Sequence, residues 1–306
     1  YGADILRIWV VASDYSEDLK IDNQIISYQI DSYRKIRNTL RFLLGNLYNF
    51  SKQNLVVPEE MPELERYLLT RISSLNEKLK ELVSKHDYHA IYTALLNFCT
   101  LELSAFYFDI RKDSLYCDDI KSIKRRSTST CLHIIFEFLT KWLSPIVSFT
   151  CEEAWKSRSY SNEESILLQN VKDDEFTYKD ISLEKVFEEL KRVRKSVTSA
   201  LELKRNEKLI GSSLQAKVIL FLSKDTQKII ADLDLAEMCI VSNVETHDIS
   251  NRSKESISIE DEEIYVEIKL ADGKKCERCW AVLQEVSSSK NNLCNRCDDV
   301  WKNFQK

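Results

Sequence analysis

Two Cys-x-x-Cys pairs near the end of the chain limit its fold more than any other feature. They are Cys276 with Cys279 and Cys294 with Cys297, and fourteen residues separate the two pairs. Each pair forms a tight knuckle that directs two sulfur atoms to one point. The segment between the pairs is long enough to bring the second knuckle back to the first. The spacing therefore predicts one four-cysteine zinc site.

The alternatives for these cysteines are a redox pair or two disulfides. A redox pair is expected beside a βαβ pattern, which does not surround these residues, and the chain has no secretory character. Four protein ligands leave zinc no position for water or substrate, so we expect a single structural zinc ion. Because the module is too small to bury much core, we expect the metal to supply its folding energy.

Two side chains of the first knuckle are candidates for binding. Arg278 lies inside it and Trp280 directly after it. A guanidinium and an indole on a rigid knuckle can stack on an unpaired base and hydrogen-bond to it. Alternatively, Trp280 caps the small core of the zinc module. The spacing by itself favours neither interpretation.

Composition predicts a mainly helical, globular protein. The 306 residues are 43% hydrophobic and 30% charged, and they include four glycines and three prolines. This favours two or three domains made mostly of long helices. A net charge of −5 means that any nucleic-acid surface must be local. We find no apolar run of membrane-spanning length and no signal peptide, and we expect a cytoplasmic monomer with no membrane partner.

Hydrophobic periodicity predicts an antiparallel helical bundle over residues 23–160. Pro145 should split or kink its last helix. We expect residues 109–119 to form a polar junction. Residues 1–22 should be a connecting segment whose apolar residues dock on something before Tyr1. The chain opens on Tyr1 and not on Met, which suggests a piece of a longer polypeptide. The expected helices span residues 23–50, 63–85, 90–108 and 127–155.

A polar, irregular stretch precedes a predicted small α/β domain over residues 161–270. A helix is expected at 183–206, strands at 217–222 and 239–241, a short helix at 226–235, and a strand or hairpin at 257–270. Residues 271–306 form the zinc-binding module. The fold class is therefore mainly α, with a helical bundle, a small α/β domain and a four-cysteine zinc module.

Two helices carry basic residues that can follow a phosphate backbone. Three arginines line one face of the first long helix, and the helix at 183–206 is the most basic element of the chain. The alternative for each is a solvated helix face with acidic partners. The candidates are Arg34, Arg37, Arg41, Lys191, Arg194 and Lys195.

The sequence contains no recognisable catalytic constellation. It has no phosphate-cradling glycine loop, no nucleophile elbow, and no Ser/His/Asp or Cys/His set that spacing can support. Adjacent acidic residues such as Glu152 and Glu153 point apart on a helix and do not form an acid/base pair. The chain by itself is therefore predicted to bind and not to catalyse.

Several motifs occur along the chain: Tyr1–Trp9 with Ala12–Asp18, Ser32–Leu47, Phe106–Asp109 with Lys112–Tyr116, Ser144–Ile146 with Phe149–Trp155, Ile210–Val218 and Cys276–Trp280. Together they resemble the C-terminal region of bacterial-type, class I isoleucyl-tRNA synthetases. The likeness covers essentially the whole chain, and the Ala-Ser-Asp-Tyr and Cys-Glu-Arg-Cys-Trp motifs favour the isoleucyl enzyme over the valyl and leucyl ones. One departure is Ser114, where the family more often has arginine, so the resemblance implies no contact for that side chain.

The resemblance implies a family that activates isoleucine with ATP and transfers it to its tRNA. The ATP-handling signatures HIGH and KMSKS are absent from this sequence, and KMSKS would lie before Tyr1. This implies a tRNA-binding part without the catalytic and editing domains, so that ATP is used only in those missing domains and the part alone is inactive. In the family the helical domain grips the anticodon stem-loop and the zinc module reaches the anticodon.

Arg278 and Trp280 match the family positions expected to meet the anticodon bases of tRNA(Ile). The resemblance therefore moves the interpretation of these two residues toward RNA binding. A different class of function is a zinc-clipped helical adaptor that binds protein. Such an adaptor should not bind tRNA, and its binding of a protein partner should not depend on Trp280.

Overall fold

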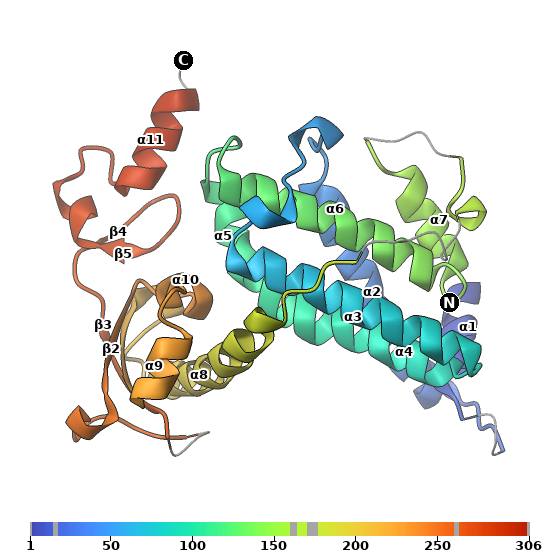
Figure 1. Ribbon diagram of the computed structural model, residues 1–306, viewed down its shortest axis with the longest axis horizontal. Coiled ribbons are helices and arrows are strands. Elements are labelled where there is room, and N and C mark those ends of the chain that lie inside the picture. The colour runs from blue at the N-terminus through green and yellow to red at the C-terminus, as the bar shows by residue number, and fades with distance from the viewer. Residues whose placement is uncertain (1, 15–17, 160–163, 170–176, 260–262, 305–306) are drawn as a thin grey trace. The chain divides into compact units, whose positions relative to one another are not determined.

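The structure is a computed structural model that describes residues 2–14, 18–159, 164–169, 177–259 and 263–304. The chain divides into two compact units, which are considered separately (Figure 1). The first contains Tyr1–Leu115 and Ile120–Lys179. The second contains the tetrapeptide Tyr116–Asp119 together with Asp180–Lys306. The domain boundaries expected after residues 22, 160 and 270 stay predictions.

The first unit is a helical bundle, as predicted. The long helices α3 and α6 pack on one another, α3 also packs on α4, and α2 packs on α6 (Figure 1). The core consists of the apolar faces of these helices, including Leu40, Leu68 and Leu139. Its helices are α1 (Ala3–Ala12), α2 (Asn23–Asn46), α3 (Glu63–Ser84), α4 (Tyr88–Asn97), the π-helical η3 (Phe98–Phe108), α5 (Asp109–Cys117) up to Leu115, α6 (Ile123–Leu143) and α7 (Ser148–Lys156), with short turns at η1 (Lys52–Asn54), η2 (Pro58–Glu60) and η4 (Ile166–Leu168). The last two residues of α5 belong to the second unit.

The break at Pro145 is confirmed, because α6 ends before it and α7 begins after it. The Asp4 carboxylate of α1 caps α7: it accepts hydrogen bonds from the backbone N–H and the hydroxyl of Thr150, at 2.9 and 2.6 Å. Ile5 and Ile8 of α1 are buried within this unit. Leu6 and Val10 of the same helix are about half exposed, so the expected docking of this segment on something before Tyr1 stays a prediction.

Helix α5 replaces the polar junction that the sequence predicted at residues 109–119. Together α4, η3 and α5 form one helical run, Tyr88–Cys117. Among the described residues this run alone is long and apolar enough to cross a membrane, by length and composition. That corrects the expectation that no run reaches such a length. A core helix satisfies the same criterion, and Leu95, Leu103 and Tyr107 of this run are fully buried.

The polar residues of α5 are compatible with a helix because the core supplies partners for them. Arg111 donates hydrogen bonds to both carboxylate oxygens of Glu65, at 2.7 and 2.6 Å. The Tyr107 hydroxyl and the Thr128 hydroxyl donate to the same carboxylate, at 3.1 and 3.3 Å. A buried ion pair is tolerated only when its remaining hydrogen-bonding capacity is used, which is the case here.

The second unit contains a three-stranded sheet covered by helix α8 (Ile181–Asn206). Strand β1 (Ala216–Leu222) is central and buried; it pairs in parallel with β2 (Asn243–Asp248) and antiparallel with β3 (Tyr265–Leu270). Val218 therefore pairs with Val244 on one side and Ile268 on the other. This confirms the predicted small α/β arrangement, including the buried strand at 217–222. Short segments η5 (Ser213–Gln215) and η6 (Ile249–Asn251) flank the strands.

Two local predictions for this unit are wrong. The expected single helix at 226–235 is two helices, α9 (Lys224–Ile229) and α10 (Leu235–Cys239). The expected strand at 239–241 does not form, because the Asp234 side chain caps α10 and the helix runs to Cys239. Ile240 then adopts the left-handed backbone conformation, with φ 57°, and ends the helix. Strand β2 begins at Asn243.

The four cysteines lie in a small module at the end of the second unit. A hairpin of β4 (Lys274–Lys275) and β5 (Val282–Leu283) carries the first pair, and η7 (Gln284–Ser288) leads to the second pair at α11 (Asn295–Phe304). The Ser242 hydroxyl accepts a hydrogen bond from the Val282 N–H at 2.8 Å and donates to the carbonyl of Leu214. One hydroxyl therefore connects the hairpin to η5, the turn directly before β1.

Candidate metal centre and its surroundings

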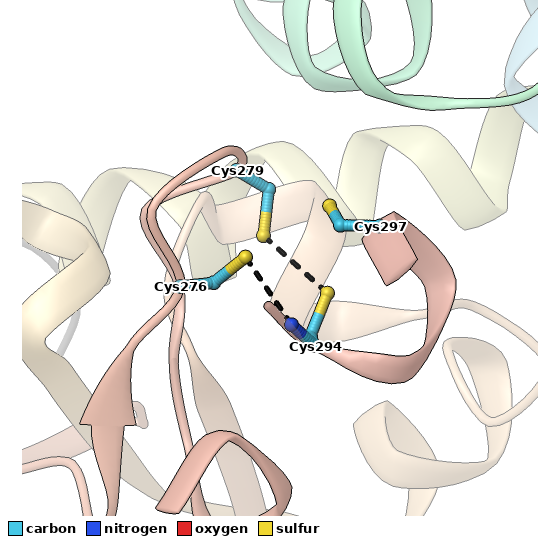
Figure 2. A group of neighbouring side chains, drawn as sticks. All are labelled: Cys276, Cys279, Cys294 and Cys297. Atoms are coloured by element: carbon cyan, nitrogen blue, oxygen red, sulfur yellow. Dashed lines mark hydrogen bonds between the residues drawn. The ribbon is translucent and has the colours of Figure 1, made fainter. Parts of the chain in front are cut away.

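The four cysteine sulfur atoms converge on one point, and all lie within 4.8 Å of one another (Figure 2). Cys276 and Cys279 come from the turn between β4 and β5, and Cys294 and Cys297 from the start of α11. Four sulfurs about 2.3 Å from a tetrahedral zinc ion are about 3.8 Å apart. The Sγ atoms of Cys279 and Cys294 are 3.8 Å apart. The donor set therefore fits zinc.

Backbone N–H groups around the knuckles favour the thiolate form of Cys276, which is the form that binds a cation. The Cys294 N–H donates to the Cys276 Sγ at 3.3 Å, and the Trp280 N–H closes the knuckle on the Cys276 carbonyl at 3.0 Å. Burial alone would raise the pKa of Cys276, but the N–H groups of Cys279, Cys294 and Arg278 together lower it to about 7. Burial raises the pKa of Cys294 to about 11. A bound zinc ion would favour the thiolate at every position.

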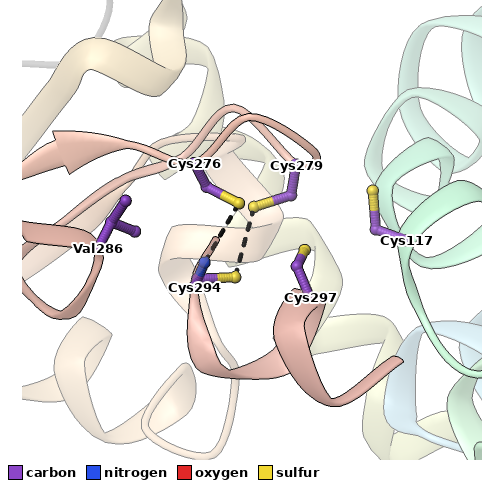
Figure 3. Packing of buried hydrophobic residues seen from close by; sticks show 6 residues of the cluster. All are labelled: Cys117, Cys276, Cys279, Val286, Cys294 and Cys297. Atoms are coloured by element: carbon purple, nitrogen blue, oxygen red, sulfur yellow. Dashed lines mark hydrogen bonds between the residues drawn. The ribbon is translucent and has the colours of Figure 1, made fainter. Parts of the chain in front are cut away.

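A fifth cysteine packs on this cluster within the second unit. Cys117 is buried, and it forms one hydrophobic cluster with the four cysteines and Val286 (Figure 3). Its thiol donates to the carbonyl of Arg278, with a distance of 3.8 Å. Hydrogen bonding with Cys117 raises the pKa of Cys297 to about 12. Sequence analysis missed this neighbour, because nothing in the spacing of Cys117 relates it to residues 276–297.

Arg278 is directed toward the backbone of the tetrapeptide Tyr116–Asp119. Its Nη1 donates to the Cys117 carbonyl at 2.6 Å, and its Nη2 donates to the Tyr116 carbonyl at 3.1 Å. The side chain is partly buried by this arrangement. The fork of the guanidinium matches two neighbouring carbonyl oxygens.

Trp280 lies on the surface of the zinc module. Its side chain is 60% exposed and is not part of the buried cysteine cluster, so the structure disfavours a role in capping the core. Its φ is 68°, in the left-handed region, directly after the knuckle. The Lys275 Nζ lies 5.2 Å from the centre of the indole ring, within the range of a cation–π contact.

The three arginines predicted on α2 differ in their surroundings. Arg34 pairs with Asp31 at 3.1 Å, and Arg37 pairs with Glu153 on α7 at 2.8 Å. Hydrogen bonds to Glu153 and Tyr33 raise the pKa of Arg37. Arg41 is exposed and lines an open groove of about 400 Å³ between α2 and α7, and no ion pair is recorded for it among the described residues. Two of the three positive charges therefore have acidic partners.

The basic residues predicted on α8 lie in the second unit. Arg194 donates to the Met238 carbonyl at 2.9 Å, so it anchors α10. Lys195 is exposed and Lys191 is partly buried. Of these three, Lys195 is the most accessible to a ligand.

The sequence matches two known protein families. Residues 65–220, just over half of the chain, match the anticodon-binding domain of tRNA ligase. Residues 273–300 match a zinc finger found in FPG and IleRS. The second match contains all four converging cysteines, so the module is a zinc-binding one.

Several curated proteins are similar along nearly the whole chain. The isoleucine–tRNA ligase of Pelagibacter ubique is 44% identical over 285 residues, which are 92% of this chain and 30% of that protein. Those of Ruegeria pomeroyi and Gluconobacter oxydans are 39% and 40% identical, over 97% and 98% of this chain. The chain covers 31% and 30% of those two proteins. It therefore spans slightly less than a third of the length of these relatives.

Proposed function

The chain belongs to the family of tRNA ligase anticodon-binding domains, and from this we propose that it is the tRNA-binding part of an isoleucine–tRNA ligase. The observation that carries the proposal is the presence of an anticodon-binding match and an IleRS-type zinc-finger match in one chain. Its partner would be tRNA(Ile), bound at the anticodon stem-loop. The longer protein would attach isoleucine to that tRNA with ATP, and this part would not do so alone.

In this proposal one zinc ion has a structural role. It would be held by Cys276, Cys279, Cys294 and Cys297, which leave no coordination position for a substrate. When bound, the ion cross-links the two knuckles and supplies folding energy to the module. The protein would act as a monomer in the cytoplasm, as expected for a tRNA ligase with no membrane partner.

Trp280 is the residue best placed to contact a base. An exposed indole on a metal-stiffened turn offers a flat surface to an unpaired anticodon base, and a stacked base contributes roughly 1–3 kcal/mol. Lys275 beside the ring adds a positive charge for the neighbouring phosphate. Base contacts of this kind supply specificity.

Phosphate contacts would supply orientation and salt-dependent affinity. Arg34, Arg37, Arg41 and Lys195 are the exposed members of the predicted basic set. Arg34 and Arg37 would have to exchange their carboxylate partners for phosphate. Lys191 and Arg194 would contribute mainly through the positive potential of α8.

The experiment that tests the proposal is binding of the 306-residue chain to a tRNA(Ile) transcript and to a non-cognate transcript across a salt series. We expect a preference for tRNA(Ile) that persists as salt rises, because base stacking is less screened than phosphate contacts. Equal binding that disappears with salt would contradict anticodon recognition by this chain. Absence of any binding would favour the protein-binding adaptor.

Trp280→Ala, with Trp301→Ala as its control, tests the residue assignment. Both tryptophans are on the zinc module and are similarly exposed, at 60% and 50%. We expect Trp280→Ala to weaken binding of the tRNA(Ile) anticodon stem-loop by roughly 1–3 kcal/mol. Trp301→Ala should leave it within about 0.5 kcal/mol. Unchanged affinity of Trp280→Ala, with zinc retained, would contradict the assignment.

A further inference from the structure

The zinc module holds every residue of the tetrapeptide Tyr116–Asp119, and both belong to the second unit. Arg278 donates to two of its carbonyls, and the Cys117 thiol donates back to the Arg278 carbonyl. From the start of α11, Arg296 pairs with Asp118 at 2.9 Å. The Asn303 amide reaches Asp119 at 3.4 Å, a weak contact.

Arg278 satisfies a need that any helix end creates. The last carbonyls of a helix have no partner within it, and a cation there is favoured by the helix dipole. Tyr116 and Cys117 are the last two residues of α5, and their carbonyls both accept from the same guanidinium. Two of the five N–H donors of the guanidinium are engaged in this way, one on each terminal nitrogen.

Asp118 provides a second attachment with different chemistry. Its side chain is only 9% exposed, and its carboxylate accepts a charged hydrogen bond from Arg296. Leaving a buried carboxylate without such a partner is costly. Arg296 lies between Cys294 and Cys297, just as Arg278 lies between Cys276 and Cys279. The middle of each zinc knuckle therefore contributes one arginine to the same tetrapeptide.

We propose that Arg278 is a positioning residue which, together with Arg296, latches the zinc knuckles to Tyr116–Asp119 and so fixes the direction in which Trp280 is presented to RNA. Trp280 follows Arg278 by two residues across the rigid turn at Cys279. Arg278 acts on RNA through Trp280 and does not itself contact a base. This inference rests on the proposed function, since it assumes that Trp280 stacks on RNA.

A double-mutant cycle between Arg278 and Trp280 separates positioning from direct contact. The full chain is used, with the tRNA(Ile) anticodon stem-loop as ligand and zinc content measured in each variant. We expect Arg278→Ala to weaken binding by a factor approaching that of Trp280→Ala, roughly 5- to 150-fold. The double variant should bind about as weakly as Trp280→Ala alone. Additive losses would mean that Arg278 makes a contact of its own and would overturn the proposal.

Asp118→Asn is a second test, because simple electrostatics and loss of the Arg296 attachment predict opposite changes in RNA affinity. It removes a negative charge, so simple electrostatics predicts tighter RNA binding. Loss of the Arg296 attachment predicts weaker binding. The matched control is Asp119→Asn, which removes the same charge one residue away and leaves the Arg296–Asp118 pair in place. We expect Asp118→Asn to bind more weakly than Asp119→Asn, by several-fold; equal affinities of the two variants would overturn the latch.

The RNA affinities of the variants and the zinc content of Arg278→Ala distinguish failure of the latch from other failures. If the unmodified chain shows no preference for tRNA(Ile), the proposed function fails. If it shows that preference but Trp280→Ala binds RNA normally, the assignment of Trp280 fails and the latch with it. If Trp280→Ala binds weakly and Arg278→Ala is additive with it, only the latch fails. If Arg278→Ala loses zinc, Arg278→Lys takes its place in the cycle, because lysine keeps the charge but cannot span both carbonyls. Arg278→Lys should then be non-additive with Trp280→Ala, and an additive loss would overturn the proposal.

Discussion

Arg37 on α2 donates two hydrogen bonds to Glu153 on α7, with N–O distances of 2.8 and 3.1 Å. The hydrogen bond with Arg37 lowers the pKa of Glu153. Both side chains remain about half exposed, so the pair contributes little to folding stability. It does determine how much positive charge the groove beside Arg41 presents, because a phosphate must replace Glu153 before Arg37 can bind it.

Glu153→Gln should strengthen RNA binding by the chain. The substitution removes an acidic group from the groove and makes Arg37 available to a phosphate. Binding should then release about one more counterion, so the affinity should fall more steeply as the salt concentration rises. Binding of the anticodon stem-loop across a salt series measures both effects. The control is the same substitution in an Arg37→Ala background, where the gain should shrink. An equal gain in both backgrounds would show that Arg37 takes no part.

Cys294→Ser should release zinc and unfold the zinc module while the helical bundle keeps its helicity. The substitution removes one of four converging ligands, and the core of the module consists largely of the cysteines themselves. Metal analysis and far-UV circular dichroism measure the two effects. A metal chelator should reproduce them in the unmodified chain. A loss of most of the helical signal would contradict the independence of the bundle.

Arg111→Ala should destabilise the helical bundle by about 3–5 kcal/mol, because it leaves the Glu65 carboxylate buried without its cation. Urea unfolding measures the change in the free energy of unfolding. Replacing both residues at once with apolar ones, as in Glu65→Leu with Arg111→Met, should cost less than Arg111→Ala alone. Lys112→Ala, at the exposed neighbouring position, is the control and should change stability by less than about 0.5 kcal/mol.

The bundle should lose stability in mild acid because of His133. Burial, assisted by Lys52, Arg158 and Lys141, lowers the pKa of His133 to about 4 from 6.5. Between these two values the unfolded chain binds the proton and the folded chain does not. Stability is therefore full above about pH 6.5, decreases as the pH falls, and is lower by about 2 kcal/mol at about pH 5.

Urea unfolding of His133→Gln at neutral pH and at about pH 5 tests this dependence. The variant cannot titrate at this position, so its stability should change less between the two conditions than that of the unmodified chain. His89→Gln, an exposed position on α4, is the control and should keep the original dependence. The same pH dependence in His133→Gln would show that other groups are responsible.

Where local chemistry decides a feature, the sequence was a reliable guide to it. The cysteine spacing predicted a convergent zinc site, and the four sulfur atoms converge. Pro145 predicted a break, and the helix ends two residues before it. The apolar run at 217–222 predicted a buried strand, and β1 is the central strand of its sheet. These features depend on residues that are neighbours in the chain.

Where partners are distant in the chain, the sequence was a poor guide. The sequence predicted a polar junction at residues 109–119 because the partner of Arg111 is Glu65, 46 residues away. It offered the guanidinium of Arg278 to a base because the carbonyl partners of that group are 161 and 162 residues away. No periodicity relates such residues, so only folding reveals that their charges are used.

The sequence by itself therefore determined the convergence of the four cysteines, the helical class and the family likeness, since each is carried by short-range spacing or by matched motifs. The tertiary structure decided which charged side chains remain available. Of the two candidate residues at the first knuckle, it left Trp280 exposed and engaged Arg278 with the end of α5. The physical reason is that a charged group takes the partner that folding brings within hydrogen-bond distance, and that partner can lie anywhere in the chain.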